Sequence, residues 1–382
     1  SFGEEAGAHF TSRDIIYLMT DLLLADADLD TGGMTVYDMT MGTSQMLSCM
    51  EERIHDLNSD IEVTCFGQEF NPSTYAIAKA DMMIRGGDPD NMRFGDTLSD
   101  DQFAGFTFDY CISNPPFGID WKREQKKVEE EAAKGEQGRF APGLPKISDG
   151  QQLFVLNGLS KLAPNGKMAI IQNGSPLFSG DAGSGSSEIR RYILENDWLD
   201  CIVQLSKDMF MNTGISTYIW ICSKNKPAYR EGKVQLIDAS HCYEARRKSI
   251  GTKRNDITDQ CRELIVKAYG SFENCAVYGD KSGIYCESKI FETVEFGYNK
   301  IVVERPQRDE NGEIVLKKGK PVADASLRDT ESVPLTQDID RYFEREVLPY
   351  AEDAWIDKKK TKVGYEIPMT RYFYEYQAPE KV

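Results

Sequence analysis

Short apolar runs alternate with segments of helical periodicity along the first 223 residues of the chain. The apolar runs predict strands over residues 34–38, 61–66, 92–94, 108–113, 167–172, 199–205 and 217–222. Helical spacing of apolar residues predicts helices over residues 12–24, 45–57, 71–84, 149–162 and 187–195. Buried-looking strands that alternate with helices indicate a mostly parallel sheet covered by helices on both faces.

Two segments interrupt this alternation. Residues 120–148 are charged and weakly patterned, and the Ser- and Gly-rich residues 179–187 predict a flexible loop. Neither segment carries a periodic apolar pattern, so we expect both to be connections between elements of the sheet.

The pattern changes after residue 238. Residues 256–269 form a helical run, and residues 301–322 are typical of a β-hairpin around Asn311-Gly312. The basic residues 246–254 indicate a contact with phosphate or a partner, or else a solvated loop, which is the more common case. We therefore expect a first domain over residues 1–245 and a C-terminal extension over residues 246–382.

The composition narrows the class of protein. The 382 residues carry a net charge of −17, which disfavours contact with a polyanion unless basic residues cluster or a partner contributes. Nine cysteines without a CxxC pair, and only three histidines, argue against a disulfide framework or a metal site and favour a reducing cytoplasm. No apolar run approaches the ~18 residues of a membrane span, and the N-terminus is no signal peptide. Since the chain does not begin with Met, we expect a fragment or a processed protein.

The strongest chemical signal is Asn114-Pro115-Pro116-Phe117, which directly follows a predicted strand. Ligands of open parallel sheets bind beyond the carboxyl ends of the strands, and consecutive prolines hold carbonyl groups outside the strand ladder. An aromatic amino group presents two N–H donors, which the Asn114 side-chain oxygen and the Pro115 carbonyl could accept while Phe117 stacks on the base. Taken alone, the segment is equally consistent with a proline-stiffened turn.

Three more polar groups follow predicted strands. A small-residue loop with Gly42 follows Asp38, Glu69 ends the second strand where ribose hydroxyls bind in nucleotide-binding sheets, and Asp96 ends the third. Each of these alone is more simply an ordinary turn or a solvated carboxylate. Because Asp38, Glu69, Asp96 and Asn114 follow four successive strands, one crevice is expected to collect them all.

With these residues, the chain resembles the modification (methyltransferase) subunit of type I restriction-modification systems, of the gamma class of amino-methyltransferases. The resemblance rests on Phe10-Thr11-Ser12-Arg13, the loop 38–44, Gly67-Gln68-Glu69-Phe70-Asn71-Pro72, Gly95-Asp96-Thr97-Leu98, Asn114-Pro115-Pro116-Phe117-Gly118, Pro164-Asn165-Gly166-Lys167, Asn173-Gly174, Leu177-Phe178, Asn212-Thr213-Gly214-Ile215, Phe296-Gly297-Tyr298 and Val303-Glu304-Arg305-Pro306. It implies a class I S-adenosylmethionine-dependent methyltransferase fold, with a mostly parallel seven-stranded sheet and a C-terminal extension. This chain has Met39, Met41 and Ser44-Gln45 where the family usually has Pro, Cys and a second Gly, so we expect a narrower donor pocket.

The resemblance also implies the cofactor and the residues that hold it. S-adenosyl-L-methionine would be bound by Thr11, Asp38, Thr40, Gly42, Thr43, Ser44, Glu69, Phe70, Asp96 and Thr97. Within this set, Thr11 and the loop 38–43 would hold the methionine part, Glu69 the ribose and Asp96 the adenine. Asn114, Pro115, Pro116 and Phe117 would hold a target adenine flipped out of the DNA helix.

The implied function is transfer of a methyl group to the N6 amino group of adenine in DNA. The implied partners are DNA, a specificity subunit, a restriction subunit and a second copy of the modification subunit, in the cytoplasm. Residues 1–245 would then be the catalytic domain and residues 246–382 a partner-subunit interface. Two alternatives stay open: methylation of an amino nitrogen in RNA or protein, and a catalytically silent scaffold or DNA-binding subunit with the same fold.

Overall fold

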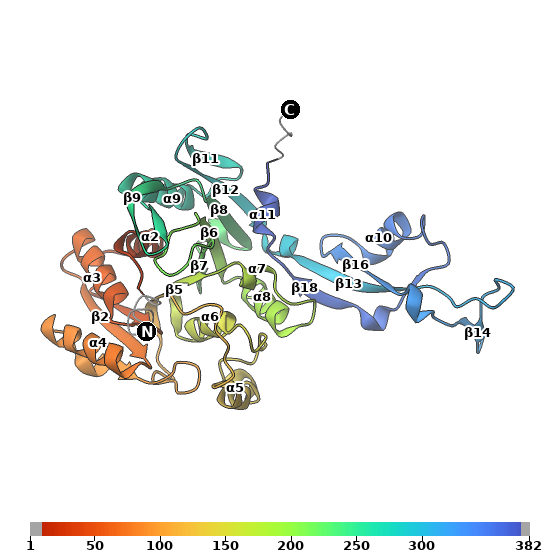
Figure 1. Cartoon of the computed structure of the whole chain (residues 1–382), viewed down its shortest axis with the longest axis horizontal. Helices are drawn as coiled ribbons and strands as arrows, with labels where there is room; N and C mark the ends of the chain where they lie inside the picture. Colours follow the sequence, from red (N-terminus) through yellow and green to blue (C-terminus); the bar gives the residue numbers. More distant parts are fainter. Residues whose placement is uncertain (1–9, 376–382) are drawn as a thin grey trace.

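A large mixed sheet runs through the body of the molecule (Figure 1), which we describe from a computed structural model for residues 10–375. Its strand order is β11-β12-β8-β6-β7-β5-β4-β1-β2-β3. In chain order its strands are β1 (Gly33–Asp38), β2 (Glu62–Glu69), β3 (Met92–Phe94), β4 (Phe108–Ser113), β5 (Leu162–Gln172), β6 (Leu199–Leu205), β7 (Tyr218–Ser223), β8 (Lys233–Ala239), β11 (Ala276–Gly279) and β12 (Tyr285–Glu292).

Most strand pairs in this sheet are parallel, as expected. Strand β1 pairs in parallel with β2 and with β4. Strand β3 pairs in parallel with the other side of β2, and β5 pairs in parallel with the other side of β4. Strand β7 runs antiparallel between β5 and β6. The carboxyl ends of β1 to β5 therefore meet at one edge, where a parallel sheet binds its ligands.

The prediction of seven strands is wrong, because the sheet has ten strands within residues 10–375. The three additional strands, β8, β11 and β12, carry weak hydrophobic signals. Buried Gln235 interrupts β8, and its amide donates to the Ala268 carbonyl and to Ser288 Oγ. Strands β11 and β12 form an antiparallel pair at the sheet edge, where side chains are only partly buried. These two strands lie beyond residue 245, so the sheet spans the predicted domain boundary, and the division of the chain there stays a prediction.

Helices cover both faces of the sheet. Helices α2 (Arg13–Leu24), α3 (Gln45–Leu57), α4 (Pro72–Ile84) and α9 (Asp259–Ser271) contribute to one apolar core. Helices α6 (Gln151–Ser160), α7 (Ser175–Phe178) and α8 (Gly185–Glu195) contribute to the other. The start of α4 follows from its sequence, since Asn71 caps the helix by accepting from Thr74 N and Pro72 occupies the first turn.

The two segments that interrupt the predicted pattern contain short helices. Residues 120–148 include α5 (Gln125–Ala132) and a 3-10 turn at Gly135–Gln137. Helix α8 begins at Gly185, inside the predicted loop, and Ser184 caps it by accepting from Ser187 N.

Residues 297–365 form an arm that extends away from the sheet (Figure 1). It contains β13 (Gly297–Glu304), β14 (Leu316–Lys317), β15 (Lys320–Pro321), β16 (Asp329–Pro334), α10 (Ile339–Glu346), β17 (Trp355–Ile356) and β18 (Lys362–Tyr365), and α11 (Met369–Tyr372) follows it. Its own apolar core is formed by Ile301, Val303, Val333, Phe343 and Val347. The predicted turn at Asn311-Gly312 is confirmed by the antiparallel bridge between Arg308 and Ile314, but the hairpin expected over residues 301–322 is not, because β13 pairs with β16, β17 and β18 instead. No helix within residues 10–375 is long and apolar enough to cross a bilayer.

A buried charge network fixes β6 against α9. The Arg230 guanidinium donates to Asp200 Oδ1 (3.1 Å) and to the Tyr269 carbonyl. The Tyr269 hydroxyl donates to Asp200 Oδ2 (2.5 Å), and Lys167 Nζ donates to the same hydroxyl. Both side chains of the Arg230–Asp200 ion pair are almost fully buried, so the loss of either charge would leave the other without compensation in a low-dielectric interior.

We predict that Arg230→Met lowers the free energy of unfolding by about 3–5 kcal/mol, because Asp200 then stays buried without its ion-pair partner. Urea unfolding at pH 7 measures this. Arg345→Met is the matched control, since Arg345 is 59% exposed and pairs with Glu346 on the surface; we expect a change within about 0.5 kcal/mol. Equal losses in the two variants would contradict a structural role for the buried network.

Candidate active site

The polar residues predicted to share a crevice lie at one edge of the sheet. Parallel pairing sets Asp38 of β1 opposite Gly67 of β2, and Glu69 opposite Phe94 of β3. Asn114 follows the last residue of β4, which pairs with β1. The sheet therefore brings the four predicted strand ends together.

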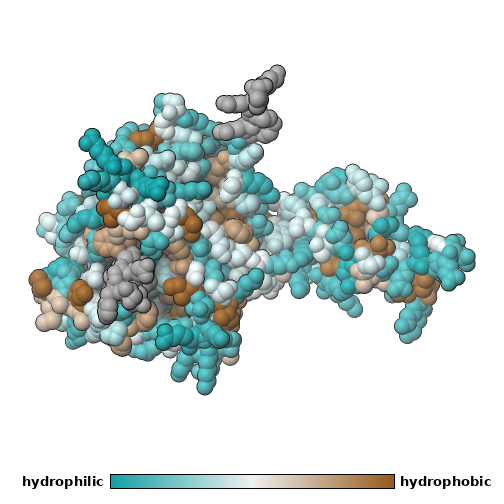
Figure 2. All heavy atoms as spheres, in the orientation of Figure 1, coloured by the Kyte–Doolittle hydropathy of each residue, from teal (hydrophilic) through white to brown (hydrophobic). Residues whose placement is uncertain are grey.

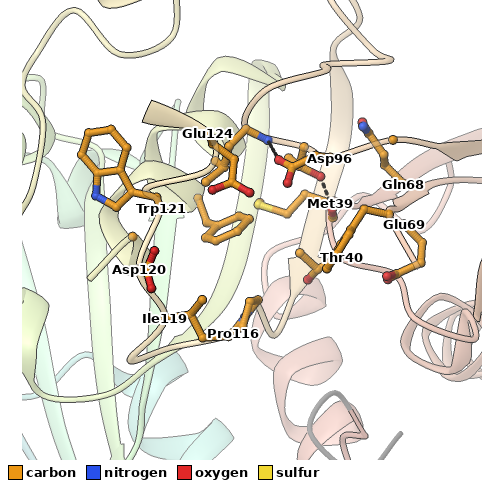
Figure 3. A pocket seen from close by; sticks show the side chains of 16 residues that line it. Met39, Thr40, Gln68, Glu69, Asp96, Pro116, Ile119, Asp120, Trp121 and Glu124 are labelled. Carbon is orange, nitrogen blue, oxygen red and sulfur yellow. Dashed lines mark hydrogen bonds between the residues drawn. The ribbon is translucent and has the colours of Figure 1, made fainter. Parts of the chain in front are cut away.

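A cavity opens at this edge (Figure 3). Of the residues that sequence reasoning selected, it is lined by Thr40, Glu69, Phe70, Asp96, Thr97 and Pro116. The other selected residues, which are Thr11, Asp38, Gly42, Thr43, Ser44, Asn114, Pro115 and Phe117, do not line it. Met39, which was expected to narrow the donor pocket, also lines it, as do Gln68, Gly95 and Leu98 from the motifs of the resemblance. The lining residues that sequence reasoning missed are Ile119, Asp120, Trp121, Glu124, Gly150 and Phe154.

The Asp38 carboxyl group lies behind the cavity wall, 2% exposed, and joins β1 to β4. Its Oδ1 accepts from Thr40 N (3.0 Å) and from Ser113 Oγ (2.8 Å). Thr40 Oγ1 lies 2.9 Å from the same Ser113 Oγ. Burial raises the pKa of Asp38 to about 7, although the hydrogen bonds from Thr40 and Ser113 oppose this shift. Asp38 thereby holds the loop after β1 against the residue that precedes Asn114.

Glu69 holds the same loop from the other side. Its Oε2 accepts from Gly42 N and its Oε1 accepts from Asn71 N, both at 3.0 Å. Gly42 has a φ of +55°, a conformation that residues with a Cβ rarely adopt. The 7% exposed carboxylate fixes the loop and still lines the cavity, where its remaining lone pairs can accept from hydroxyl groups.

Asp96, after β3, and Glu124, before α5, lie next to each other in the cavity wall (Figure 3). Asp96 Oδ1 accepts from Leu98 N and Ser99 N, and Thr97 Oγ1 donates to the Met39 carbonyl. Partial burial, a hydrogen bond to Asp96 and the negative charge of Asp96 raise the pKa of Glu124 to about 7. A ligand here therefore meets two neighbouring carboxyl groups, of which Glu124 has the raised pKa.

Trp121 and Glu124 belong to the weakly patterned segment 120–148, and Ile119 directly precedes it. Two backbone hydrogen bonds join the two ends of this segment. Trp121 N donates to the Ile147 carbonyl (3.0 Å), and Gly150 N donates to the Ile119 carbonyl (3.1 Å). Two large apolar residues within a charged stretch, directly after the Asn-Pro-Pro-Phe segment, are the signal that could have found this wall.

Arg139 links this segment to the residues after β3 through hydrogen bonds. Its guanidinium donates to Glu131, to Asn157 Oδ1 (3.0 Å) and to the carbonyls of Thr97 (2.6 Å) and Leu98 (3.0 Å). The side chain is 7% exposed. The walls from β3 and from residues 119–148 are thus held together by one buried cation.

Asn114 is oriented by Thr11, 103 residues earlier in the chain. Asn114 Nδ2 donates to Thr11 Oγ1 at 2.9 Å, and Thr11 is buried. No hydrogen bond among residues 10–375 uses the Asn114 amide oxygen, so it stays available as an acceptor. Pro116, two residues on, lines the cavity. The Asn-Pro-Pro-Phe segment therefore lies at the rim of the cavity that Glu69 and Asp96 line.

Met39 and Met41, the bulky residues of the loop after β1, lie in different surroundings. Met39 lines the cavity, whereas Met41 is buried and does not. Gly67 leaves space for Met41, since a Cβ at position 67 would lie 2.3 Å from Met41 Sδ. Ser44 adopts the left-handed conformation, with a φ of +69°, which explains why a second Gly suits this position in the family loop.

Comparison with solved structures defines the fold class. The structure is similar to the methyltransferase subunit of a type I restriction-modification system from Streptococcus thermophilus, with a TM-score of 0.60 and 29% identity over 73% of this chain and 55% of that chain. It is also similar to the EcoKI M protein, with a TM-score of 0.54 and 19% identity over 74% and 62% of the two chains. The fold is that of S-adenosylmethionine-dependent methyltransferases, as expected, and S-adenosylmethionine is the expected cofactor.

The chain belongs to the N-6 DNA methylase family, whose model matches residues 1–311. It is 29% identical over 273 residues to the methylase subunit of the type I restriction enzyme MjaIX from Methanocaldococcus jannaschii, covering 71% of this chain and 46% of the relative. It is 27% identical over 375 residues to the HindI methylase subunit from Haemophilus influenzae, covering 95% and 75%. The resemblance to type I modification subunits is confirmed, and the chain spans about half the length of the MjaIX subunit.

The cavity residues fit the adenosyl part of this cofactor. Carboxylates at Glu69, Asp96 and Glu124 can accept from ribose hydroxyls and from an adenine amino group. Leu98 and Phe154 supply the apolar walls that a purine ring requires. The cavity has a surplus of acceptors, which suits a ligand with several donors and a positive charge.

We predict that the stability contributed by Asp38 falls as the pH rises from about 4 to about 7. In this range the buried carboxyl group keeps its proton in the folded chain and loses it in the unfolded chain, so ionisation favours unfolding. Urea unfolding of the wild type and Asp38→Asn at pH 5, 6, 7 and 8 tests this. The wild type should lose stability relative to the variant up to pH ~7; a constant difference would contradict the raised pKa.

Proposed function

We propose that this chain transfers a methyl group from S-adenosylmethionine to the N6 amino group of a flipped adenine in DNA, as the modification subunit of a type I complex. The observation that carries the proposal is the position of the Asn-Pro-Pro-Phe segment. Asn114 is fixed by Thr11 with its amide oxygen available, and Pro116 lines the cavity that Glu69 and Asp96 share. Family membership supports the same function.

The target base meets two acceptors and an aromatic ring. The Asn114 amide oxygen and the Pro115 carbonyl accept the two N–H bonds of the adenine amino group, which increases the electron density on its nitrogen. Phe117 is partly buried against the core beside β4, and its ring provides a stacking surface for the base. Acceptors suit this reaction better than a strong base, because the amino nitrogen has little lone-pair density of its own. As the nitrogen bonds to the methyl carbon, the bond from that carbon to sulfur breaks, and the methylated nitrogen releases one proton to water. The base must leave the duplex to reach the segment.

The donor site is assigned from the cavity walls. When bound, S-adenosylmethionine supplies a methyl group on a positively charged sulfur. Glu69 accepts from the ribose hydroxyls and Asp96 from the adenine amino group, with Phe70 and Thr97 beside them. Thr11 and the loop residues Asp38, Thr40, Gly42, Thr43 and Ser44 hold the methionine part. The buried carboxyl group of Asp38 acts chiefly by fixing this loop next to Ser113.

The partners follow from the same family. We propose that a specificity subunit selects the DNA site, that a restriction subunit joins for cleavage, and that a second copy of this chain completes the complex in the cytoplasm. Residues 246–382, which include the arm, would supply the interface to other subunits. The net charge of −17 supports this division, since a partner then contributes much of the attraction to DNA.

We predict that Asn114→Ala lowers the rate of methyl transfer by at least about a hundredfold, the usual effect of removing one preorganised polar contact to the reacting group. Donor affinity should fall far less than the rate, because Asn114 reaches the donor side only through its hydrogen bond to Thr11. The assay follows labelled methyl groups into DNA with the complex co-expressed from neighbouring genes. Asn225→Ala is the control, since Asn225 is an exposed amide bonded to Asn165. A normal rate in Asn114→Ala would exclude the proposed role.

We predict that Asp96→Ala weakens S-adenosylmethionine binding by about tenfold or more, because a hydrogen bond to a charged group contributes about 1.5–3 kcal/mol. Isothermal titration measures this. Asp88→Ala is the matched control, since Asp88 likewise caps a backbone N–H, at Asp90, and does not line the cavity. Equal affinities in the two variants would contradict the adenine role of Asp96, and a wild type without donor binding would favour the silent scaffold.

A further inference from the structure

The β9–β10 hairpin presents an exposed basic surface. It consists of β9 (Glu244–Ile250) and β10 (Lys253–Asp256), which pair with each other and form a separate two-stranded sheet. Almost every side chain of β9 is exposed. In the view of Figure 2, strongly hydrophilic residues gather over this hairpin. Apolar burial therefore does not explain why the chain forms a ribbon here.

Polar contacts hold the hairpin against α2 and against the residues that follow β6. Lys253 is buried, and its Nζ donates to Asp14 Oδ2 (3.0 Å) and to the Met209 carbonyl (3.1 Å). Thr252 Oγ1 donates to the Phe210 carbonyl, and Asn255 Nδ2 donates to the Lys207 carbonyl. The hairpin is thus fixed to residues 207–211, which follow the carboxyl end of β6.

The same contacts link the hairpin to the Asn-Pro-Pro-Phe segment through the start of α2. Asp14, which receives Lys253 and Ile257 N, lies in the first turn of α2. Thr11, three residues earlier, accepts from Asn114. One short stretch of chain therefore contacts both the hairpin and the amide that faces the target base.

Three cations of the hairpin have no ion-pair partner among residues 10–375. Arg246 pairs with Asp256, and Lys253 pairs with Asp14 and Asp256. Arg247, Lys248 and Arg254 are exposed and enter no ion pair among residues 10–375. In a chain of net charge −17, three exposed cations without an ion-pair partner among residues 10–375 form a surface suited to an anion.

We propose that Arg247, Lys248 and Arg254 bind phosphates of the DNA backbone next to the flipped adenine. The proposal rests on the proposed function, since it names the surface by which this chain holds its substrate. Phosphates are the ligand of choice because they lie on both sides of any flipped nucleotide, whatever its sequence. A basic contact there also offsets the repulsion between the acidic chain and DNA.

The test compares two triple variants of the full chain. In the first, Arg247, Lys248 and Arg254 become Gln; in the second, the control, Lys317, Lys318 and Lys320 become Gln. The control removes the same charge from exposed lysines near β14 and β15, at the end of the arm away from the sheet. Fluorescence anisotropy with a mixed-sequence duplex, over a range of salt concentrations, measures affinity, and isothermal titration measures S-adenosylmethionine binding.

The hairpin variant should bind the duplex at least about tenfold more weakly at low salt, and the slope of log K against log salt should decrease by about 2.7, or 0.9 for each lost phosphate contact. Its S-adenosylmethionine affinity and the DNA affinity of the control should not change. Equal losses in both variants, an unchanged hairpin variant, or a wild type that fails to bind the duplex would each overturn the proposal. So would unchanged DNA affinity with lost co-purification of neighbouring subunits, which would assign the hairpin to a protein contact.

The proposed activity fails in a different way. A wild type that binds the duplex through the hairpin but transfers no methyl group in the assembled complex would overturn the activity and leave the DNA surface in place.

Discussion

The buried carboxyl group of Asp38 is the contact on which the geometry of the site depends. It joins Thr40, in the loop after β1, to Ser113 at the end of β4. Asn114 follows Ser113, and Glu69 holds the same loop at Gly42. A loop that lost Asp38 would keep its tie to β2 and the contact between Thr40 Oγ1 and Ser113 Oγ (2.9 Å), but it would lose both hydrogen bonds to the carboxyl group, so the donor side and the target side of the site would be coupled more weakly.

The sequence predicted the elements that build this geometry. The helix from Gln45 to Leu57 and the strands from Met92 to Phe94 and from Phe108 to Ser113 agree with the expected bounds. These elements have local signals, because each has a short apolar run or a helical period bounded by polar or turn residues. The gathering of Asp38, Glu69, Asp96 and Asn114 also followed from local order, since consecutive parallel strands end at one edge.

The missed features depend on contacts between distant residues. Strand β8 contains Gln235, which is tolerated because it bonds to α9 and to β12, neither of which a local pattern reveals. The wall formed by Ile119, Trp121 and Glu124 is set by backbone bonds to residues 147 and 150 and by Arg139. Sequence periodicity indicates which residues of a single helix or strand are buried. A wall that is held by two backbone hydrogen bonds and one buried arginine therefore has no periodic pattern that the sequence could show.

Electrostatics constrains how one site could bind both the positively charged donor and the negatively charged DNA of the proposed reaction. The donor cavity is rich in carboxylates, which suits a positively charged donor and repels the phosphates of DNA. At physiological salt this repulsion is screened beyond roughly 8 Å, so only charges close to the target base decide whether DNA can approach. The requirement is therefore that carboxylates line the donor cavity and that cations lie on the surface that DNA approaches. The positions of Glu69 and Asp96 in the cavity wall and of the β9–β10 hairpin at α2 agree with this requirement, so the proposed donor and DNA surfaces of a strongly acidic chain do not conflict.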